Sequence, residues 1–200
     1  MIAFVSGILE MKLNSYIVID VGGIGYKVFM AENVIDSLED VGTKVKVYTH
    51  QHVREDDISL YGFLTMEELN MFELLISVSG VGAKSALGIL ANIEPSSFAL
   101  AVISNDTSKL VKIPGIGAKS AARIILELKD KLKNQDALDK KDVNTKLPKI
   151  NDESIDEAIC ALKVLGYTRK DIEKVFEKIE LSNLTVEEII KQGLKYLSRS

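Results

Sequence analysis

The chain has 200 residues, of which 46% are hydrophobic and 27% are charged, and its formal net charge is -4. This composition is typical of a globular protein, no apolar run reaches the roughly 18 to 20 residues that span a membrane, and the first residues lack the features of a signal peptide. We therefore expect a cytoplasmic protein. The negative charge argues mildly against nucleic-acid binding, but residues 64–133 carry 8 basic and 7 acidic residues, whereas residues 1–63 carry 5 and 9.

The first 63 residues are typical of β-structure. Segments 17–21, 26–30 and 45–49 are rich in β-branched and aromatic residues and alternate partly with period two, and glycines separate the first two. About five short strands in this length fit a small closed barrel better than an open sheet. We therefore expect a β-barrel over residues 1–63.

The character of the sequence changes at Leu64. Thr65 and Glu68 have capping-box spacing, and the apolar residues that follow recur at helical intervals. Residues 64–133 should therefore form an all-α unit without strands. Helices are expected at 66–78, 83–91, 96–104, 107–111 and 118–132.

A polar segment, residues 134–151, follows and is nearly devoid of large apolar residues, which predicts a flexible linker. Capping-box patterns then begin at Ser154, Thr168 and Thr185, each followed by apolar residues at helical spacing. Residues 152–200 should therefore form a three-helix bundle. The expected fold class is α+β and multidomain.

The single cysteine, Cys160, excludes an internal disulfide framework. It lies in an apolar helical pattern, and an unpaired cysteine usually behaves as a small hydrophobic residue. We expect its thiol to be in or near the core.

The strongest functional signal is an internal repeat in the helical segment. Residues 79–84 read Ser-Gly-Val-Gly-Ala-Lys, residues 114–119 read Pro-Gly-Ile-Gly-Ala-Lys, and both continue Ser-Ala, at an offset of 35 residues. A repeated supersecondary unit indicates a shared structural task. The pattern is that of a helix-hairpin-helix motif.

The chemistry of this motif favours the DNA backbone. Paired glycines permit a tight turn, Val81 or Ile116 would insert into the core, and the free N–H groups at the next helix start attract a phosphate. Lys84 and Lys119 add positive charge, and nothing in the pattern reads a base, so binding should be independent of sequence. The candidate DNA-binding residues are Ser79, Gly80, Val81, Gly82, Lys84, Gly115, Ile116, Gly117, Lys119, Ser120 and Arg123.

Other phosphate-binding and catalytic interpretations fit less well. A P-loop requires adjacent Gly-Lys, but Ala83 and Ala118 intervene, and the dinucleotide fingerprint requires a third glycine and a preceding strand. Glycines that serve helix packing alone would not explain two matched lysines. A DNA glycosylase would pair Lys119 with an aspartate such as Asp136, but that residue falls in the expected linker. The classes left open are a junction-binding scaffold, a glycosylase or nuclease, and a general duplex-binding architectural protein.

Two further clusters have ambiguous patterns. Glu55, Asp56 and Asp57 form an acidic run between strands, which fits a solvated turn, an Mg²⁺ site or an element that repels phosphate. Three adjacent carboxylates make a poor chelate. His50 and His52 share a strand face, but no third ligand is evident, so we expect no metal site.

The whole chain resembles the RuvA family, the Holliday-junction-binding subunits of the bacterial branch-migration machinery. The resemblance rests on both hairpins and on four further motifs. These are Asp-Val-Gly-Gly-Ile-Gly-Tyr at 20–26, Val-Arg-Glu-Asp at 53–56, Leu-Tyr-Gly-Phe at 60–63 and Ala-Leu-Lys-Val-Leu-Gly-Tyr at 161–167.

The resemblance implies an OB-fold over residues 1–63, a tandem helix-hairpin-helix domain over 64–133, a linker over 134–151 and a mobile third domain over 152–200. It implies a homotetramer, singly or as two sandwiching copies, that holds a four-way junction open and planar. Glu55 and Asp56 match the family's acidic pin, which makes a functional role preferable to a solvated turn. Implied partners are the RuvB ATPase, bound by the third domain, and the RuvC resolvase. The chain itself should be non-catalytic and need no cofactor.

The departures from the family pattern are small. Ala83 and Ala118 stand where relatives often have proline or lysine, which would lower affinity without changing the binding mode.

Overall fold

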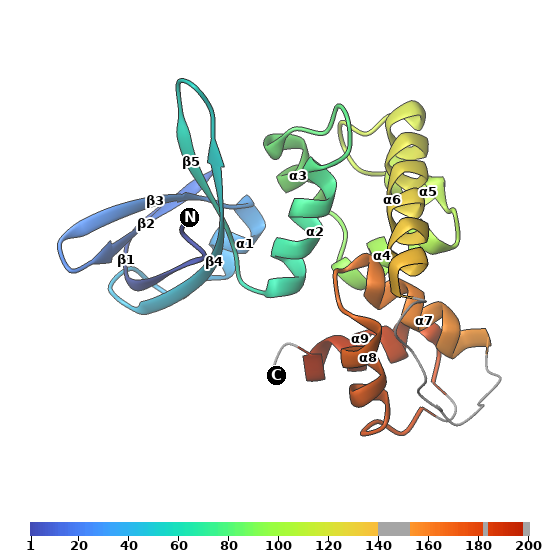
Figure 1. The fold of residues 1–200 in the computed structure, drawn as a ribbon. Coiled ribbons are helices and arrows are strands. Elements are labelled where there is room, and N and C mark those ends of the chain that lie inside the picture. Colours follow the sequence, from blue (N-terminus) through green and yellow to red (C-terminus); the bar gives the residue numbers. More distant parts are fainter. Residues whose placement is uncertain (140–152, 182–183, 198–200) are drawn as a thin grey trace. The chain divides into compact units, whose positions relative to one another are not determined.

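The computed structural model describes residues 1–139, 153–181 and 184–197. The N-terminal part is a closed barrel with strand order β1-β2-β3-β5-β4 (Figure 1). All neighbouring strands are antiparallel except β3 and β5, which run parallel. The elements are β1 (Phe4–Leu13), β2 (Tyr16–Val21), β3 (Ile24–Phe29), α1 (Glu32–Ser37), β4 (Lys44–Val53) and β5 (Ile58–Phe63).

The alternating pattern of the strands places one row of side chains inside the barrel. Leu9, Ile17, Ile19, Val28 and Val47 are fully buried there, because successive side chains of a strand point to opposite faces. The expectation of a five-stranded barrel is thus confirmed. Helix α1 was not anticipated: it is only six residues long and buries a single large side chain, Ile35, so it has too little periodicity to be recognised.

Two helices pack with the barrel in one compact unit, which comprises residues 1–76 and 82–92. They are α2 (Met66–Ile76) and α3 (Ala83–Leu90). The ring of Phe72 on α2 lies 4.9 Å from that of Phe63 and 5.2 Å from that of Tyr61, so an aromatic cluster joins α2 to the barrel. The expected division at residues 63 and 64 stays a prediction, because contacts cross that position.

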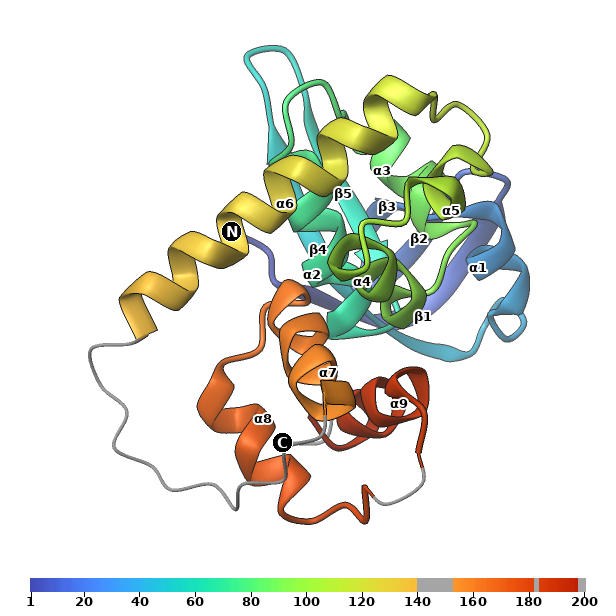
Figure 2. The ribbon, with the colours of Figure 1, turned by 90° about the vertical axis from the view of Figure 1, so that its right-hand side faces the viewer.

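The second compact unit comprises residues 77–81 and 93–200. Its helices are α4 (Pro95–Ile103), α5 (Thr107–Val111), α6 (Ala118–Asp139), α7 (Glu153–Val164), α8 (Arg169–Phe176) and α9 (Val186–Leu197). Phe98, Ala99 and Val102 on α4 are fully buried. Helices α7, α8 and α9 form the expected C-terminal helical group (Figure 2).

The capping pattern marks three helix starts correctly, at Thr65, Thr168 and Thr185, and fails at Ser154. The Thr168 hydroxyl accepts the N–H of Asp171 at the start of α8. The Thr65 hydroxyl accepts the N–H of Glu68, whose carboxylate accepts the N–H of Thr65. Burial raises the pKa of this Glu68 carboxyl, although the backbone N–H groups that it accepts oppose the shift. Thr185 and Glu188 form the same reciprocal pair. Ser154, in contrast, lies inside α7, which begins at Glu153.

The expectation for Cys160 is wrong, because the residue is exposed. Ala158, Ile159 and Ala161 take the buried face of α7, and a helix that packs on one side leaves an intervening position outside. An apolar run alone does not reveal which residue faces outward.

Helix α6 continues to Asp139 and so includes the first six residues of the expected linker, 134–139. Lysine, glutamine, alanine and leucine propagate a helix well, so a segment of this composition can be helical. The remainder of that linker, from residue 140, lies outside the described residues. In the described ranges no single helix is long and apolar enough to cross a membrane; α3 and α4 meet that test only as a pair with a break between them, by length and composition alone.

Candidate nucleic-acid interface

The two repeated loops have nearly the same backbone geometry. The first glycine of each adopts a left-handed conformation, with φ of 86° at Gly80 and 83° at Gly115. The next N–H closes the turn, from Val81 to the carbonyl of Val78 and from Ile116 to the carbonyl of Ile113, at 3.1 Å in both. Glycine tolerates this positive φ without the steric cost that a Cβ would bring. The repeat is therefore one turn used twice.

The aliphatic residue between the glycines is not the main anchor of the turn. Val81 and Ile116 are only half-buried, whereas Val78 and Ile113, three positions earlier, are 2% and 4% exposed. The expectation that Val81 or Ile116 inserts into the core is met only in part. Val78 and Ile113 therefore anchor the two turns, each two residues after the end of the helix that precedes it.

The second glycine of each loop opens a helix. Ala86 donates its N–H to the carbonyl of Gly82, and Ala121 donates to that of Gly117, both at 2.9 Å. The preceding N–H groups of such a helix start have no partner within the helix and carry the positive end of its dipole. Both loops therefore present the backbone arrangement that attracts an anion.

Nothing within the fold requires a glycine at these second positions. Gly82 has an ordinary extended backbone, with φ of -87° and ψ of 167°. A Cβ built at Gly82 or Gly117 would meet no atom within 4 Å. The surface beside each helix start is thus left bare, and a group from outside the chain can approach the backbone closely.

Residues of both loops line one cavity in the second unit. The cavity measures about 410 Å³. Its lining residues are Ser79, Gly80 and Val81 from the first loop and Lys119, Ser120 and Arg123 from α6. The sequence-predicted residues of the second hairpin therefore meet part of the first hairpin, although 35 residues separate the two copies.

Helix α6 also holds the first loop in place. The carboxylate of Glu127 accepts the N–H of Ser79 at 3.1 Å, and the guanidinium of Arg123 donates to the carbonyl of Ser79 at 3.4 Å. Arg123 and Glu127 pair with each other at 3.6 Å. Sequence reasoning missed Glu127, since an acidic residue on a predicted DNA-binding helix gives no signal of its own.

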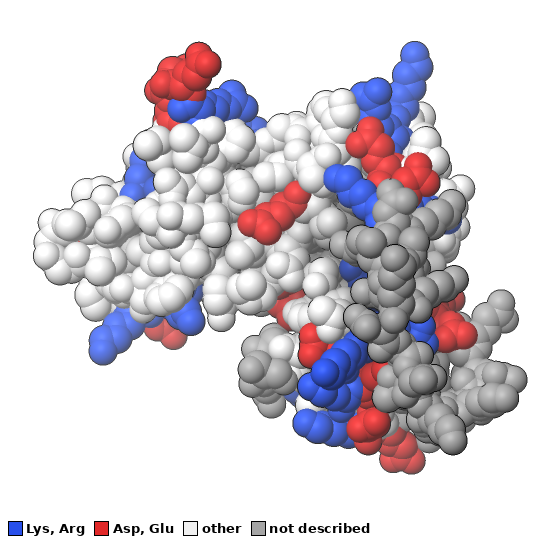
Figure 3. Space-filling model, in the orientation of Figure 1, with Lys and Arg blue, Asp and Glu red and all other residues white. Residues whose placement is uncertain are grey.

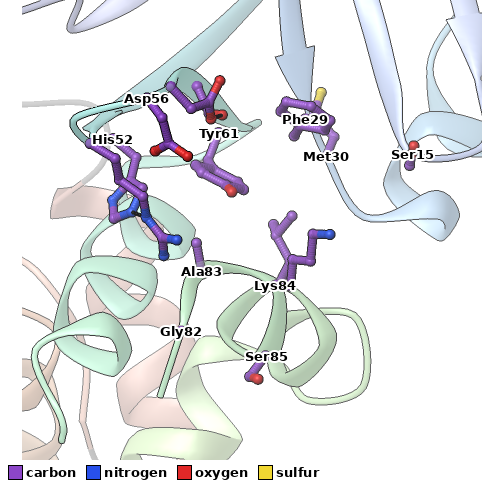
Figure 4. A pocket seen from close by; sticks show the side chains of 14 residues that line it. Ser15, Phe29, Met30, His52, Asp56, Tyr61, Gly82, Ala83, Lys84 and Ser85 are labelled. Carbon is purple, nitrogen blue, oxygen red and sulfur yellow. Dashed lines mark hydrogen bonds between the residues drawn. The ribbon is translucent and has the colours of Figure 1, made fainter. Parts of the chain in front are cut away.

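Lys84 belongs to the first compact unit, with Gly82 and Ala83, whereas Lys119 belongs to the second. Lys84 lines a larger cavity of about 860 Å³, whose other wall is the barrel (Figure 4). Sequence reasoning missed the aromatic residues of that wall, Phe29 and Tyr61, because they belong to strands distant in the chain.

The acidic run lies on the turn between β4 and β5. The N–H of Arg54 donates to the carbonyl of Asp57 at 2.8 Å and closes this turn. Asp57 also accepts the hydroxyl of Ser59, whereas Glu55 and Asp56 are exposed and show no side-chain partner among the described residues. Figure 3 shows a patch of acidic side chains where Figure 1 places the tip of this hairpin. Asp57 therefore helps to hold the turn, whereas the carboxylates of Glu55 and Asp56 make no such contact among the described residues.

The two histidines share a face of β4, as expected, with ring centres 6.2 Å apart. Each has its own partner: His50 pairs with Glu73 at 3.0 Å, and His52 accepts the Nε of Arg54 at 3.0 Å. Within the described ranges, no group of three His, Cys, Asp or Glu side chains is arranged to hold a metal ion.

Three family models match the chain in succession. Residues 1–62 match "RuvA N terminal domain", residues 72–130 match "SAM-like Helix-hairpin-helix tandem", and residues 153–198 match "RuvA, C-terminal domain".

Curated relatives match over the full length and carry the name "Holliday junction branch migration complex subunit RuvA". The protein of Acetivibrio thermocellus is 46% identical over 201 residues, covering 100% of both chains. That of Ruminiclostridium cellulolyticum is 43% identical over 205 residues, covering 98% of this chain and 100% of the relative. That of Clostridium perfringens is 42% identical over 204 residues, covering 100% of both chains.

Proposed function

Because the chain belongs to the RuvA family, we propose that it is the subunit of a branch migration complex that binds four-way (Holliday) junction DNA in recombination and repair. The observation that carries this proposal is the duplicated hairpin, with a bare glycine at each helix start. Glycines that the fold does not need are explained when a phosphate backbone lies against them. Lys84, Lys119 and Arg123 supply the positive charge.

Contacts of this type hold DNA without reading its sequence. Helix starts and lysines recognise phosphates, which are the same at every base pair. The preference for a junction must therefore come from shape. Glu55 and Asp56 support such a preference, because exposed carboxylates repel phosphates, and a pin of like charge favours strands that separate around it.

The remaining parts of the proposal concern assembly. Four copies would bring four hairpin tips together at the crossover and hold the junction open and planar, as one tetramer or as two that sandwich the DNA. The C-terminal helices, residues 152–200, would recruit the RuvB ATPase, and the RuvC resolvase would act on the same junction. In this scheme the chain contributes binding and geometry, without catalysis, and the motor hydrolyses ATP.

A gel-shift comparison tests the function directly. The full chain is titrated onto a four-way junction and onto a linear duplex of the same arm sequence, at fixed salt and without ATP. We expect the junction to bind at a lower protein concentration. Equal affinity for the two DNAs would contradict the proposal, and cleavage or base release by the chain alone would contradict its non-catalytic role.

The matched control removes equal charge at different places. Lys119→Ala should weaken junction binding, whereas Lys178→Ala, which removes an exposed lysine two residues after the end of α8, should leave it unchanged. An equal loss in both variants would mean that net charge, rather than the hairpin, determines binding.

A further inference from the structure

Arg54 directly precedes the three acidic residues of the β4–β5 turn, yet its side chain pairs with none of them. A guanidinium ordinarily prefers a carboxylate to a neutral acceptor, because charge-assisted hydrogen bonds are about twice as strong. Among the described residues, however, Arg54 forms no ion pair with a carboxylate. Its Nε donates instead to Nε2 of His52, at 3.0 Å. The repulsive role of the turn does not explain this choice of partner.

The alternation of β4 directs Arg54 away from the end of the hairpin. Residues two positions apart on a strand share one face, so Arg54 and His52 lie on the same side of β4. His52 is paired with Ser59 of β5, one register step closer to the barrel than the pair of Val53 and Ile58. The hydrogen bond therefore draws the guanidinium toward the barrel and away from the tip, which Figure 1 shows extending beyond the other strands.

The opposite strand holds Asp57 in a similar way. Its carboxylate accepts the hydroxyl of Ser59, which is also two positions nearer the barrel. Glu55 and Asp56, which lie between Arg54 and Asp57, are exposed and have no side-chain partner among the described residues. The hairpin thus holds one cation and one anion along its strands and leaves two anions at its tip.

The bond from Arg54 defines the state of the His52 ring. A ring nitrogen that accepts an N–H carries no proton, so the neutral ring has its proton on Nδ1. The ring also lies edge-on to Tyr61 and near the ring of His50, with 6.2 Å between centroids in both pairs. Because these neighbours restrict the orientation of the imidazole, it offers the guanidinium an acceptor in a fixed place.

We propose that His52 is a positioning residue for the acidic turn, which holds the Arg54 guanidinium away from Glu55 and Asp56 so that both carboxylates remain unneutralised. Without this acceptor, Arg54 would pair with the carboxylates beside it and cancel part of their charge. The inference rests on the proposed junction binding and deepens it, because the preference for a junction then depends on where one cation is held as well as on the acidic residues.

Nitrogen-15 NMR of the full chain tests the hydrogen bond without DNA. The chain has two histidines, so histidine-selective labelling gives two rings, and the spectrum of His52→Gln assigns them. At mildly alkaline pH we expect the His52 proton on Nδ1 in the unmodified chain. In Arg54→Ala it should move largely to Nε2, the nitrogen that carries it in most free histidine. A His52 proton on Nε2 in the unmodified chain would overturn the proposal.

His52→Phe tests the consequence for DNA by gel shift. Phenylalanine keeps a ring beside Tyr61 but offers no acceptor, so Arg54 should pair with the tip carboxylates. We expect linear duplex to bind about twofold to fivefold more tightly, since one exposed charge a few ångströms away acts through water, and the preference for a junction to narrow. His52→Gln, whose amide oxygen can accept the Arg54 N–H, should behave like the unmodified chain. An equal gain in the Gln and Phe variants would contradict the role of the acceptor.

The same substitution without Arg54 separates positioning from a structural effect. In an Arg54→Ala background, His52→Phe has no cation to release and should leave duplex binding as it is in Arg54→Ala alone. An equal gain in both backgrounds would assign the effect to the ring itself and refute the positioning role. Thermal unfolding shows whether the barrel of each variant is intact, and the NMR measurement on the unmodified chain holds even if His52→Phe fails to fold.

The outcomes separate this inference from the proposed function. If the junction binds better than duplex but a folded His52→Phe variant binds duplex no more tightly than the unmodified chain, the inference is wrong and the function stands. If the unmodified chain shows no preference for a junction, the function fails, and the positioning role is still tested. A proton on Nδ1 of His52 together with tighter duplex binding by His52→Phe supports it, and the absence of either overturns it.

Discussion

At each hairpin two glycines stand two positions apart, and the fold uses them differently. Gly80 and Gly115 have φ near 85°, where a Cβ is strained whatever the surroundings. Gly82 and Gly117 have room for a Cβ and no left-handed backbone. At the residue scale, the first glycines therefore serve the fold, and the second would, in the proposed function, give a phosphate access to the helix start.

We predict that Gly82→Ala with Gly117→Ala lowers DNA affinity by about tenfold or more. Each added methyl group would keep a phosphate away from a helix start, and the two sites together would lose about two charge-assisted hydrogen bonds. The free energy of unfolding should fall by about 0.5–1 kcal/mol per site, because glycine caps a helix start better than alanine does. Gel shift and urea unfolding measure the two effects.

Gly88→Ala is the control for this double variant. Gly88 lies within α3, and a Cβ there also meets no atom within 4 Å. Its replacement should stabilise the helix by roughly 0.5–1 kcal/mol and leave DNA binding intact. Unchanged DNA affinity in the Gly82 and Gly117 variant would refute the access role.

A second residue-scale prediction concerns Lys119, which lines the cavity shared by the two hairpins. If it pairs with one phosphate, Lys119→Ala should weaken binding to all sequences alike and reduce the slope of log affinity against log salt by about 1. Titrations at several salt concentrations measure the slope. A change that depends on the DNA sequence would indicate a base contact instead.

At the scale of elements, α6 connects the two hairpins. It begins at the second loop, and its Glu127 and Arg123 hold the backbone of Ser79 in the first. Lys131, one turn further, donates to the carbonyl of Ser77 at 3.0 Å. One helix thus carries the cations of the second hairpin and also holds the backbone of Ser77 and Ser79, where the first hairpin begins.

We predict that Glu127→Ala loosens the first loop, since the N–H of Ser79 loses its acceptor. The amide of Ser79 should exchange faster with solvent, and the free energy of unfolding should fall by about 1 kcal/mol, the usual worth of one hydrogen bond. Native-state hydrogen exchange provides the measurement. Glu177→Ala, at an exposed position after α8, is the control. If the Ser79 amide exchanges at the same rate in both variants, Glu127 does not hold the first loop in place.

At the scale of the whole molecule, the net charge of the chain has the same sign as that of DNA. The chain carries a net charge of -4, and 9 of its acidic residues lie in the first 63 positions, three of them at the β4–β5 turn. General attraction therefore does not explain DNA binding. In the proposed function, local cations at the hairpins attract the DNA backbone, and the hairpin tip repels it.

We predict that Glu55→Ala with Asp56→Ala strengthens binding to linear duplex and narrows the preference for a junction. The reason is that the pin's repulsion acts on any duplex that approaches the tip. Glu39→Ala with Asp40→Ala removes the same charge from another exposed part of the first unit and should have a smaller effect. Weaker or unchanged duplex binding in the first variant would disprove the repulsive role, and an equal gain in both would assign the effect to net charge.

Local pattern alone determined much of this protein. Alternation predicts the barrel strands, helical spacing and the Thr65 and Thr185 caps predict the helices, and the repeat predicts both hairpins with their lysines. These features depend on residues within a few positions of each other, and side-chain periodicity reports them directly.

Only the tertiary structure decided the rest. It exposes Cys160, assigns α3 to the same compact unit as the barrel, joins Glu127 to Ser79 across 48 residues and forms the aromatic cavity from three strands and a helix. The physical reason is that burial and long-range contacts depend on which faces of distant elements meet, and periodicity within one segment does not specify its partner.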